Sequence, residues 1–462
     1  MPSTNESIAS TPGRARRPLG NSLRIAGVVA AAGLIAAACG SSTPSASKKT
    51  SNNHTEASGS NKSTTTTTSG TGTTTTTAAG GATTTTTTAG SAGTKTTTTT
   101  AKAATSTPTT PTTAAAASTP GGSLSSNTTS TPAATLTGIG ASSIEPFYGK
   151  VLYEYNQLNH GVSVNFTGSG SGPGVTAIEQ DTANFGQSEV PMTAAQLAAS
   201  KGPVLQVPVD LGGVAVSYHV SGVSGLKLDG QVLADIYLRK ITNWNDPAIV
   251  ALNPDVTLPN ENIVPVFRSD TSGPGYDLDQ YLIDTSPAWT TAIATSSPST
   301  TWPTAGRATG DSGEDLNAGV ASYIQETEGA IGYVEYSYAL EANFSNAALL
   351  NKSGSYVTPS VSSIAAAGAT ATALSSTNFN IIYSAGGSTY PLANFSWALI
   401  YQKQPTTNTG IVLGKLFDWV TTSGQSYSSG LGYAPLPPTA VSLAHSTLLG
   451  LQTSSGSPIF SS

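Results

Sequence analysis

Apolar and polar residues are distributed very unevenly along this chain, and the distribution separates three regions. Residues 25–38 are almost all aliphatic, alanine or glycine. Threonine, alanine, serine and glycine dominate residues 41–135, whereas aliphatic and aromatic residues return at ordinary density over 136–462. Because the middle region has little apolar surface to offset the entropy of ordering, we expect it to be disordered. Only the last region is predicted to fold, as one large domain or two lobes.

Within the last region the pattern predicts three units in which a strand leads into a helix. A strand at 136–140 precedes an amphipathic helix over 145–158, in which Pro146 is tolerated in the first turn. Alternation over 162–166 predicts a second strand, followed by a helix that begins near Val175. A third strand over 263–267 precedes a helix that contains 276–283. Each loop between strand and helix is rich in serine and glycine.

These loops place hydroxyl groups at three helix N-termini. Helix N-termini expose unpaired N–H groups and carry partial positive charge, so three of them aimed at one point would bind a small oxyanion. At any single junction the serine can instead be an ordinary N-cap, and the hypothesis therefore depends on the conjunction. The residues in question are Ser142, Ser143, Ser171, Ser272 and Gly273.

Three charged residues near these loops are further candidates for an anion site. Arg268 carries a planar fork suited to an oxyanion, and Asp270 is placed to hold that guanidinium. The alternative for this pair is a surface ion pair. Glu189 follows a short apolar segment and is a candidate to point inward. The alternative is a solvated carboxylate. The glycine-rich loop at 168–174 lacks the glycine spacing of dinucleotide and P-loop sites.

Charge and composition exclude several classes of function. The net charge is -6, with no basic run after the N-terminus, so no nucleic-acid partner is expected. The single cysteine, Cys39, allows neither an intramolecular disulfide nor a cysteine-based zinc cluster. The four histidines have no metal-ligand spacing, and each is expected to be solvated or packed and not a catalytic base, so we expect no metal, no cofactor and no enzyme activity. The paired carboxylates Glu326 and Glu328, and Asp277 and Asp279, are expected on exposed faces.

The N-terminus has the features of an export signal. Four arginines within 14–24 precede the apolar stretch 25–38, which is too short for a comfortable membrane span, and Cys39 follows directly. This arrangement resembles a bacterial lipoprotein signal, in which the cysteine takes a diacylglycerol, although Ala36 stands where leucine is usual. An ordinary secretory signal is the alternative. We expect residues 1–38 to be a signal peptide and 39–135 a lipid-anchored disordered stalk that holds the folded region outside the cytoplasm.

The folded region resembles the phosphate-binding proteins of Pst-type ABC importers. The resemblance covers nearly all of 136–462 and is carried by Leu-Thr-Gly-Ile-Gly-Ala at 136–141, Gly-Ser-Gly-Ser-Gly-Pro-Gly-Val at 168–175, Asn-Phe-Gly-Gln-Ser-Glu at 184–189, Arg-Ser-Asp-Thr-Ser-Gly at 268–273 and Gly-Ala-Ile-Gly-Tyr-Val-Glu-Tyr at 329–336, with further matches at 235–244, 258–263 and 416–420. It implies an α/β type II periplasmic-binding-protein fold with two lobes joined by two crossover segments. Lobe I would comprise 136–210 and 391–462, and lobe II 211–390.

The resemblance also implies a role for each candidate residue. Phosphate would be held by Ser142, Ser143, Ser171, Arg268, Ser272 and Gly273, with Asp270 orienting Arg268 and Glu189 accepting the proton of hydrogen phosphate. The implied partners are inorganic phosphate, or another protonated oxyanion, and the permease of an ABC importer. Glu189 is longer than the usual aspartate, and Pro274 replaces a residue that donates to the anion. These departures leave open an alternative, a surface-displayed interaction protein whose anion site has decayed.

Overall fold

A computed structural model describes residues 74–78, 82–86, 124–126, 130–297, 302 and 311–461. The chain divides into two compact units, 1–107 and 108–462. In the first unit, β1 (Thr74–Ala78) and β2 (Ala82–Thr86) pair as antiparallel strands. These strands lie within the expected disordered stalk, and their β-branched threonines favour extended backbone. The predicted signal peptide and Cys39 lie outside the described residues.

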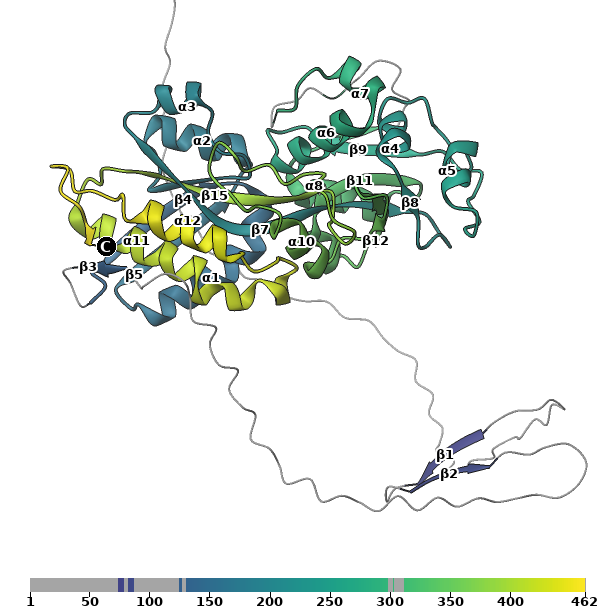
Figure 1. Cartoon of the computed structure of the whole chain (residues 1–462), viewed down its shortest axis with the longest axis horizontal. Coiled ribbons are helices and arrows are strands. Elements are labelled where there is room, and N and C mark those ends of the chain that lie inside the picture. The colour runs from purple at the N-terminus through teal and green to yellow at the C-terminus, as the bar shows by residue number, and fades with distance from the viewer. Residues whose placement is uncertain are drawn as a thin grey trace, which may run out of the picture. The chain divides into compact units, whose positions relative to one another are not determined.

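The second unit is built on a nine-stranded mixed sheet (Figure 1). Its strand order is β10-β9-β11-β7-β15-β6-β4-β5, and β12 pairs with β7 in addition. The strands are β4 (Ala134–Gly140), β5 (Val162–Gly168), β6 (Phe185–Ser188), β7 (Val204–His219), β9 (Val264–Arg268), β10 (Ser312–Glu314), β11 (Ala330–Glu335), β12 (Ser345–Asn346) and β15 (Ala393–Tyr401).

The first lobe is formed around β4, β5, β6 and β15. Helices α2 (Ser171–Gln180) and α3 (Ala194–Ala199) lie on one side of these strands and α1 (Glu145–Leu158), α11 (Thr407–Thr421) and α12 (Pro438–Leu448) on the other (Figure 1). Phe185 is fully buried and packs edge-on against Phe417 of α11 and against Tyr148 of α1. This aromatic contact fixes β6 against the helices that cover it.

The second lobe is formed around β9, β10, β11 and β12. Its aromatic core includes Trp302, which packs against Trp289, Tyr237 and Tyr333. The covering elements are α4 (Gly230–Tyr237), α5 (Pro247–Leu252), α6 (Gly273–Thr285), α7 (Pro287–Ala292), α8 (Leu316–Glu326), α9 (Tyr336–Glu341) and α10 (Val361–Gly368), with a small sheet of β8 (Lys227–Leu228), β13 (Ala348–Leu350) and β14 (Tyr356–Val357). No helix in the described residues is both long and apolar enough for a membrane span.

Strand β7 belongs to both lobes. Residues 204–213 pair with β15 of the first lobe, and residues 214–219 pair with β11 of the second. The change of partner falls between Gly213 and Val214, close to the lobe boundary expected at Asp210. The chain returns to the first lobe near Leu392, whose carbonyl accepts a hydrogen bond of 2.8 Å from the Val214 N–H. The two-lobed α/β fold expected from the sequence is therefore present.

Two element boundaries differ from the expectation. Strand β4 starts at Ala134, before the expected strand at 136–140, and β3 (Ser125–Ser126) pairs with the C-terminal β16 (Phe460–Ser461) beside the buried Leu124. Helix α2 starts at Ser171 and not near Val175. Pro173 is compatible with this start, because the N–H that a proline lacks would have no intrahelical partner in the first turn.

Two glycines of the first lobe test this packing. A Cβ on Gly138 of β4 would lie 2.1 Å from Cζ of the buried Phe185, so Gly138→Ala should destabilise the protein by about 1–3 kcal/mol. A Cβ on Gly149 of α1 meets no atom within 4 Å, so Gly149→Ala should be neutral or stabilise the helix. Thermal unfolding of both variants measures the difference, and equal melting temperatures would contradict the packing.

Candidate anion-binding site

Three helix N-termini from both lobes present buried serines. In the first lobe, the 3-10 turn η1 (Ser142–Ile144) opens α1, and Ser171 opens α2. In the second lobe, Ser272 caps α6. Each of these serines, with Ser143, is at most 3% exposed. Burial alone does not set these serines apart, since Ser286 caps α7 and is 1% exposed, so the assignment depends on what lies beside them.

Glu189 lies between the N-termini of α2 and α6. Its backbone N–H donates to the hydroxyl of Ser171 over 3.4 Å. Its side chain lies against Gly273, since a Cβ built on Gly273 would be 2.0 Å from Oε2 of Glu189. The Ser143 hydroxyl lies beside the same carboxyl and lowers its pKa, without a hydrogen bond of ordinary geometry. The carboxyl thus touches helix termini of both lobes and is 3% exposed.

Arg268 ends β9 and forms a two-bond pair with Asp270. Its Nε donates to Oδ1 at 2.6 Å and its Nη2 to Oδ2 at 2.5 Å. Asp270 also accepts from the N–H of Leu316 at 3.1 Å, and the Arg268 N–H donates to the Tyr333 hydroxyl at 2.9 Å. The guanidinium is buried, so this is not a surface pair. Its third nitrogen, Nη1, is buried and has no hydrogen-bond partner.

Ser142 and Ser272 have partners within the protein. The Ser142 hydroxyl accepts from Nδ2 of Asn317 at 3.2 Å, and its carbonyl accepts from the Tyr338 hydroxyl at 3.0 Å, so the second lobe holds this serine. The Ser272 hydroxyl accepts from the Gly275 N–H at 3.1 Å as an N-cap. Pro274 has no N–H, and the N-terminus of α6 therefore offers an anion chiefly the N–H of Gly273.

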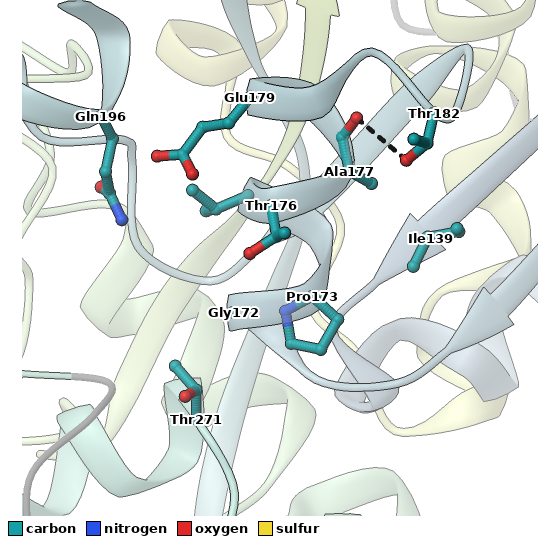
Figure 2. Close-up of a pocket in the computed structure, with 10 residues that line it drawn as sticks. Ile139, Gly172, Pro173, Thr176, Ala177, Glu179, Thr182, Gln196 and Thr271 are labelled. Atoms are coloured by element: carbon teal, nitrogen blue, oxygen red, sulfur yellow. Dashed lines mark hydrogen bonds between the residues drawn. The ribbon is translucent and has the colours of Figure 1, made fainter. Parts of the chain in front are cut away.

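The lobes also meet beside an open pocket of about 540 Å³ next to α2. Figure 2 shows Thr271, from the second lobe, opposite Gly172 and Pro173 of α2. A Cβ on Gly172 would lie 2.6 Å from Cβ of Thr271, and one on Gly170 would lie 3.0 Å from Oδ2 of Asp270. The lining includes sequence neighbours of Ser171 and Ser272 but neither of those serines.

Three further carboxyls adjoin the site and were not predicted. Asp210 of β7, Asp277 of α6 and Glu335 at the end of β11 are each at most 2% exposed. The Asn394 amide donates to Asp277, and the Gly213 N–H donates to Glu335 at 2.9 Å. One oxygen of each of these three carboxyls is buried without a partner. We call Glu189 and these three residues the acidic cluster.

The expectation that Asp277 and Asp279 lie on an exposed face is wrong. Both are fully buried. Asp277 faces Asn394, and Asp279 accepts from the indole N–H of Trp289 at 2.6 Å. Neither Asn394 nor Trp289 lies within one helical turn of these aspartates, so the sequence pattern of α6 alone does not indicate that they are buried. Glu326 and Glu328 are exposed, as expected.

Burial controls the ionisation of the acidic cluster. It raises the pKa of Glu189 to about 7, against the attraction of Arg268. Burial also raises the pKa of Asp277 and of Glu335 well above the usual range, and the charge of Glu189 adds to both shifts. For Asp210 burial again raises the pKa, partly offset by a hydrogen bond from the Leu211 backbone. A carboxyl away from water favours its neutral form.

Comparison with known proteins agrees with this architecture. Residues 125–423 match the family model of a PBP superfamily domain. Phosphate-binding protein PstS of Xylella fastidiosa is 34% identical over 310 residues, which cover 66% of this chain and 82% of that protein. Phosphate-binding protein PstS of Pasteurella multocida is 36% identical over 307 residues, covering 66% and 86%. The chain belongs to the PstS family.

Solved structures show the PstS-family fold independently of sequence similarity. The phosphate-binding protein of Stenotrophomonas maltophilia superposes with a TM-score of 0.54 over 68% of this chain and 93% of that one, at 17% identity. The described residues contain no group of three or more histidine, cysteine, aspartate or glutamate side chains that would hold a metal ion.

The acidic cluster makes stability depend on pH. A carboxyl whose pKa is higher in the folded than in the unfolded protein keeps its proton longer when folded, so it stabilises the fold at low pH. For Glu189 this contribution is complete below its ordinary value of 4.5 and is lost as the pH rises through about 7. The ligand-free protein should be more stable at about pH 5 than at about pH 8, by a few kcal/mol.

Urea denaturation at both pH values measures this difference. Asp277→Asn should reduce it, since the amide does not titrate, whereas the exposed Glu341→Gln should leave it unchanged. Equal stability of the unsubstituted protein at the two pH values would contradict the assignment.

Proposed function

We propose that this chain binds inorganic phosphate outside the cytoplasm and delivers it to an ABC importer by closure of its two lobes. The observation that supports the proposal most directly is a pair of buried donors: Nη1 of Arg268, which has no hydrogen-bond partner, and the hydroxyl of Ser143, which makes no hydrogen bond of ordinary geometry. A buried donor without a partner costs about 1–3 kcal/mol. An oxyanion between the lobes would satisfy both.

The remaining donors belong to the backbone. Helices α2 and α6 start at Ser171 and Gly273. The Ser171 hydroxyl accepts from the Glu189 N–H, and the Glu189 carboxyl lies against Gly273, so both helix starts adjoin this residue. Such N–H groups bind anions without a net charge, because the helix dipole supplies partial positive charge there. A small tetrahedral anion with several oxygens fits a site with donors on several sides.

Glu189 would distinguish hydrogen phosphate from an anion without a proton. An ionised carboxylate can accept the proton of hydrogen phosphate, whereas it repels an oxygen that has no hydrogen to share. Phosphate should therefore be preferred over sulfate wherever Glu189 is ionised. Arg268 attracts the anion, and Asp270 holds the guanidinium in a fixed plane.

Contacts between the lobes favour a closing motion. Asn317 and Tyr338 of the second lobe bond Ser142 of the first, and Asp270 lies against Gly170. Opening requires these few polar contacts to separate, while β7 and the Leu392 region keep the lobes joined. PstS relatives are named as phosphate-binding proteins. An importer's permease would receive the anion when the contacts open.

The alternative, an interaction protein with a decayed anion site, has less support. Pro274 removes one N–H from the start of α6, and Glu189 is longer than aspartate. The Arg268–Asp270 pair and the Ser143 hydroxyl are nonetheless buried. Burial of such polar groups is costly without a ligand, so a decayed site does not explain it.

Ser143 provides a sharp test of phosphate binding. Its hydroxyl makes no hydrogen bond of ordinary geometry and only adjoins the Glu189 carboxyl, so Ser143→Ala should change the stability of the free protein little. Phosphate affinity should fall about tenfold, which corresponds to the loss of one hydrogen bond to an anion. Isothermal titration calorimetry of the folded region measures this, with the exposed Ser322→Ala as control. Unchanged affinity would exclude Ser143 from the site.

Arg268→Lys tests the guanidinium. Lysine keeps the positive charge and loses both the planar fork and the two-bond pair with Asp270. We expect phosphate to bind at least about a hundredfold more weakly, and the exposed Lys352→Ala to bind normally. Normal phosphate binding by Arg268→Lys would show that the anion sits elsewhere.

Anchoring through Cys39 is a separate part of the proposal and is supported by the sequence of the export signal. Cys39→Ser should move the exported protein from the detergent-extracted membrane fraction to the soluble fraction of the cells, because the residue that would carry the lipid anchor is lost. Phosphate binding should not change. Retention of Cys39→Ser in the membrane would contradict the lipoprotein assignment.

A further inference from the structure

Ser142 of the first lobe is held at both of its oxygen atoms by side chains of the second lobe. Its hydroxyl accepts a hydrogen bond of 3.2 Å from Nδ2 of Asn317, and its carbonyl accepts one of 3.0 Å from the Tyr338 hydroxyl. The same hydroxyl of Tyr338 makes a longer contact of 3.5 Å with Oε2 of Glu145. Ser142 and Asn317 are both buried, so the bond between them lies away from water.

The orientation of the Asn317 amide decides what the Ser142 hydroxyl can do with its proton. The Glu335 N–H donates to Oδ1 of Asn317 at 2.9 Å, so this oxygen faces the end of β11 and the amide nitrogen faces Ser142. An amide nitrogen carries hydrogens and accepts no hydrogen bond. The Ser142 hydroxyl therefore cannot donate to Asn317, and its proton stays available for another acceptor, such as an oxygen of an anion.

The bond from Tyr338 acts on the neighbouring backbone donor. The carbonyl of Ser142 and the N–H of Ser143 belong to one planar peptide unit and point in opposite directions. Donors on the carbonyl side therefore fix the direction of the N–H on the far side of the plane. The Glu145 N–H, at the end of the 3-10 turn, donates to the same carbonyl. These hydrogen bonds also polarise the peptide unit and make the Ser143 N–H a stronger donor.

The backbone beside Asn317 has an unusual conformation that supports a functional role. Leu316 opens α8 with φ of 61°, in the left-handed region that leucine rarely adopts. A strained conformation of this kind persists only where the surrounding structure enforces it. The Leu316 N–H donates to Oδ1 of Asp270 at 3.1 Å, and the next residue reaches Ser142. Two successive residues of α8 thus connect the partner of Arg268 with the first lobe.

We propose that Asn317 and Tyr338 are positioning residues of the oxyanion site. By donating to the two oxygens of Ser142, they leave its hydroxyl proton and the N–H of Ser143 for the anion. Both positioning residues come from the second lobe, so the direction of these first-lobe donors depends on the lobes being together. The inference rests on the proposed phosphate site and adds residues that act through Ser142 and Ser143.

A double-mutant cycle on phosphate affinity tests the role of Asn317. Ser142→Ala and Asn317→Ala should each weaken phosphate binding about tenfold, as expected when one hydrogen bond to an anion is lost. The double variant should bind about ten- to twentyfold more weakly, and not about a hundredfold, because Asn317 acts through the Ser142 hydroxyl. Asn317→Ala combined with Ser171→Ala should instead give the full product of the two effects, since Ser171 opens a different helix. Isothermal titration calorimetry with sodium phosphate measures each affinity.

Tyr338→Phe tests the backbone bond and does not depend on how well the Asn317 variants fold. It removes the hydroxyl and keeps the ring. Phosphate should dissociate about five- to tenfold faster, with little change in the association rate, because the contact forms only after the second lobe has reached Ser142. Tyr281→Phe is the matched control: its hydroxyl donates to the Leu350 carbonyl at 2.9 Å within the second lobe, so its loss should not change phosphate release. Release of radiolabelled phosphate into an excess of unlabelled phosphate measures the dissociation rate, and the association rate follows from this rate and the affinity.

The outcomes separate this inference from the proposed function. Multiplicative effects of Ser142→Ala and Asn317→Ala, or normal phosphate affinity of Asn317→Ala, would overturn the role of Asn317. A normal dissociation rate for Tyr338→Phe would overturn the role of Tyr338. Any of these results leaves the proposed function intact as long as the unsubstituted protein binds phosphate. If the unsubstituted protein does not bind phosphate, the proposed function fails together with the inference.

Discussion

The proposed site would hold a dehydrated anion with very little positive charge. Arg268 is fully buried, and the two bonds to Asp270 neutralise most of its charge. Its contribution is therefore geometric: a nitrogen donor, Nη1, held in a fixed direction with no competing partner. The rest of the stabilisation must come from dipoles, namely N–H groups at helix starts and serine hydroxyls. Dipoles fixed before the anion arrives require no reorganisation when it binds.

This requirement explains why the site lies where β7 changes partner. The strand passes from β15 to β11 between Gly213 and Val214, and the carboxyl of Glu335 reaches back to the N–H of Gly213. Both lobes can then present helix N-termini to one point while sharing a continuous strand. The strand is buried over nearly its whole length, so water is excluded at the junction. Exclusion of water strengthens each hydrogen bond to the anion and makes every unpaired carboxyl expensive.

The sequence predicted the local features well and the long-range ones poorly. The bounds of α1 agree with the expected 145–158 because amphipathic spacing and an early proline are local signals. The loops around Ser142, Ser171 and Ser272 were found for the same reason, and the family resemblance supplied Glu189. The burial of Asp277 was not predicted, because the residues near it in sequence do not indicate it. Asp210 was also missed, although the apolar residues around it from 207 to 216 are typical of a buried strand.

Asp277 shows the physical reason for this limit. Its neighbours in α6 are another acid, a glutamine and aromatic residues, a pattern typical of a partly solvated helix face. Its partner, Asn394, comes from β15, more than a hundred residues later in the chain. Burial of a carboxyl becomes tolerable only through tertiary contacts of this kind, or through a proton, and neither is encoded in the local pattern. Acidic residues in helices near an anion site are thus poor candidates for assignment from spacing alone.

The greater length of Glu189 has a structural counterpart in Gly273. The Oε2 atom of Glu189 occupies space that a Cβ at position 273 would require, as the 2.0 Å separation from such an atom shows. The extra methylene of the glutamate is therefore accommodated where the first turn of α6 has no side chain. Because Pro274 removes the next N–H, the Gly273 N–H is the donor that α6 can offer beside this carboxyl. Glutamate, glycine and proline thus act as one unit: the carboxyl lies against the first turn of α6, and in the proposed site the anion would fit between that carboxyl, the Gly273 N–H and Nη1 of Arg268.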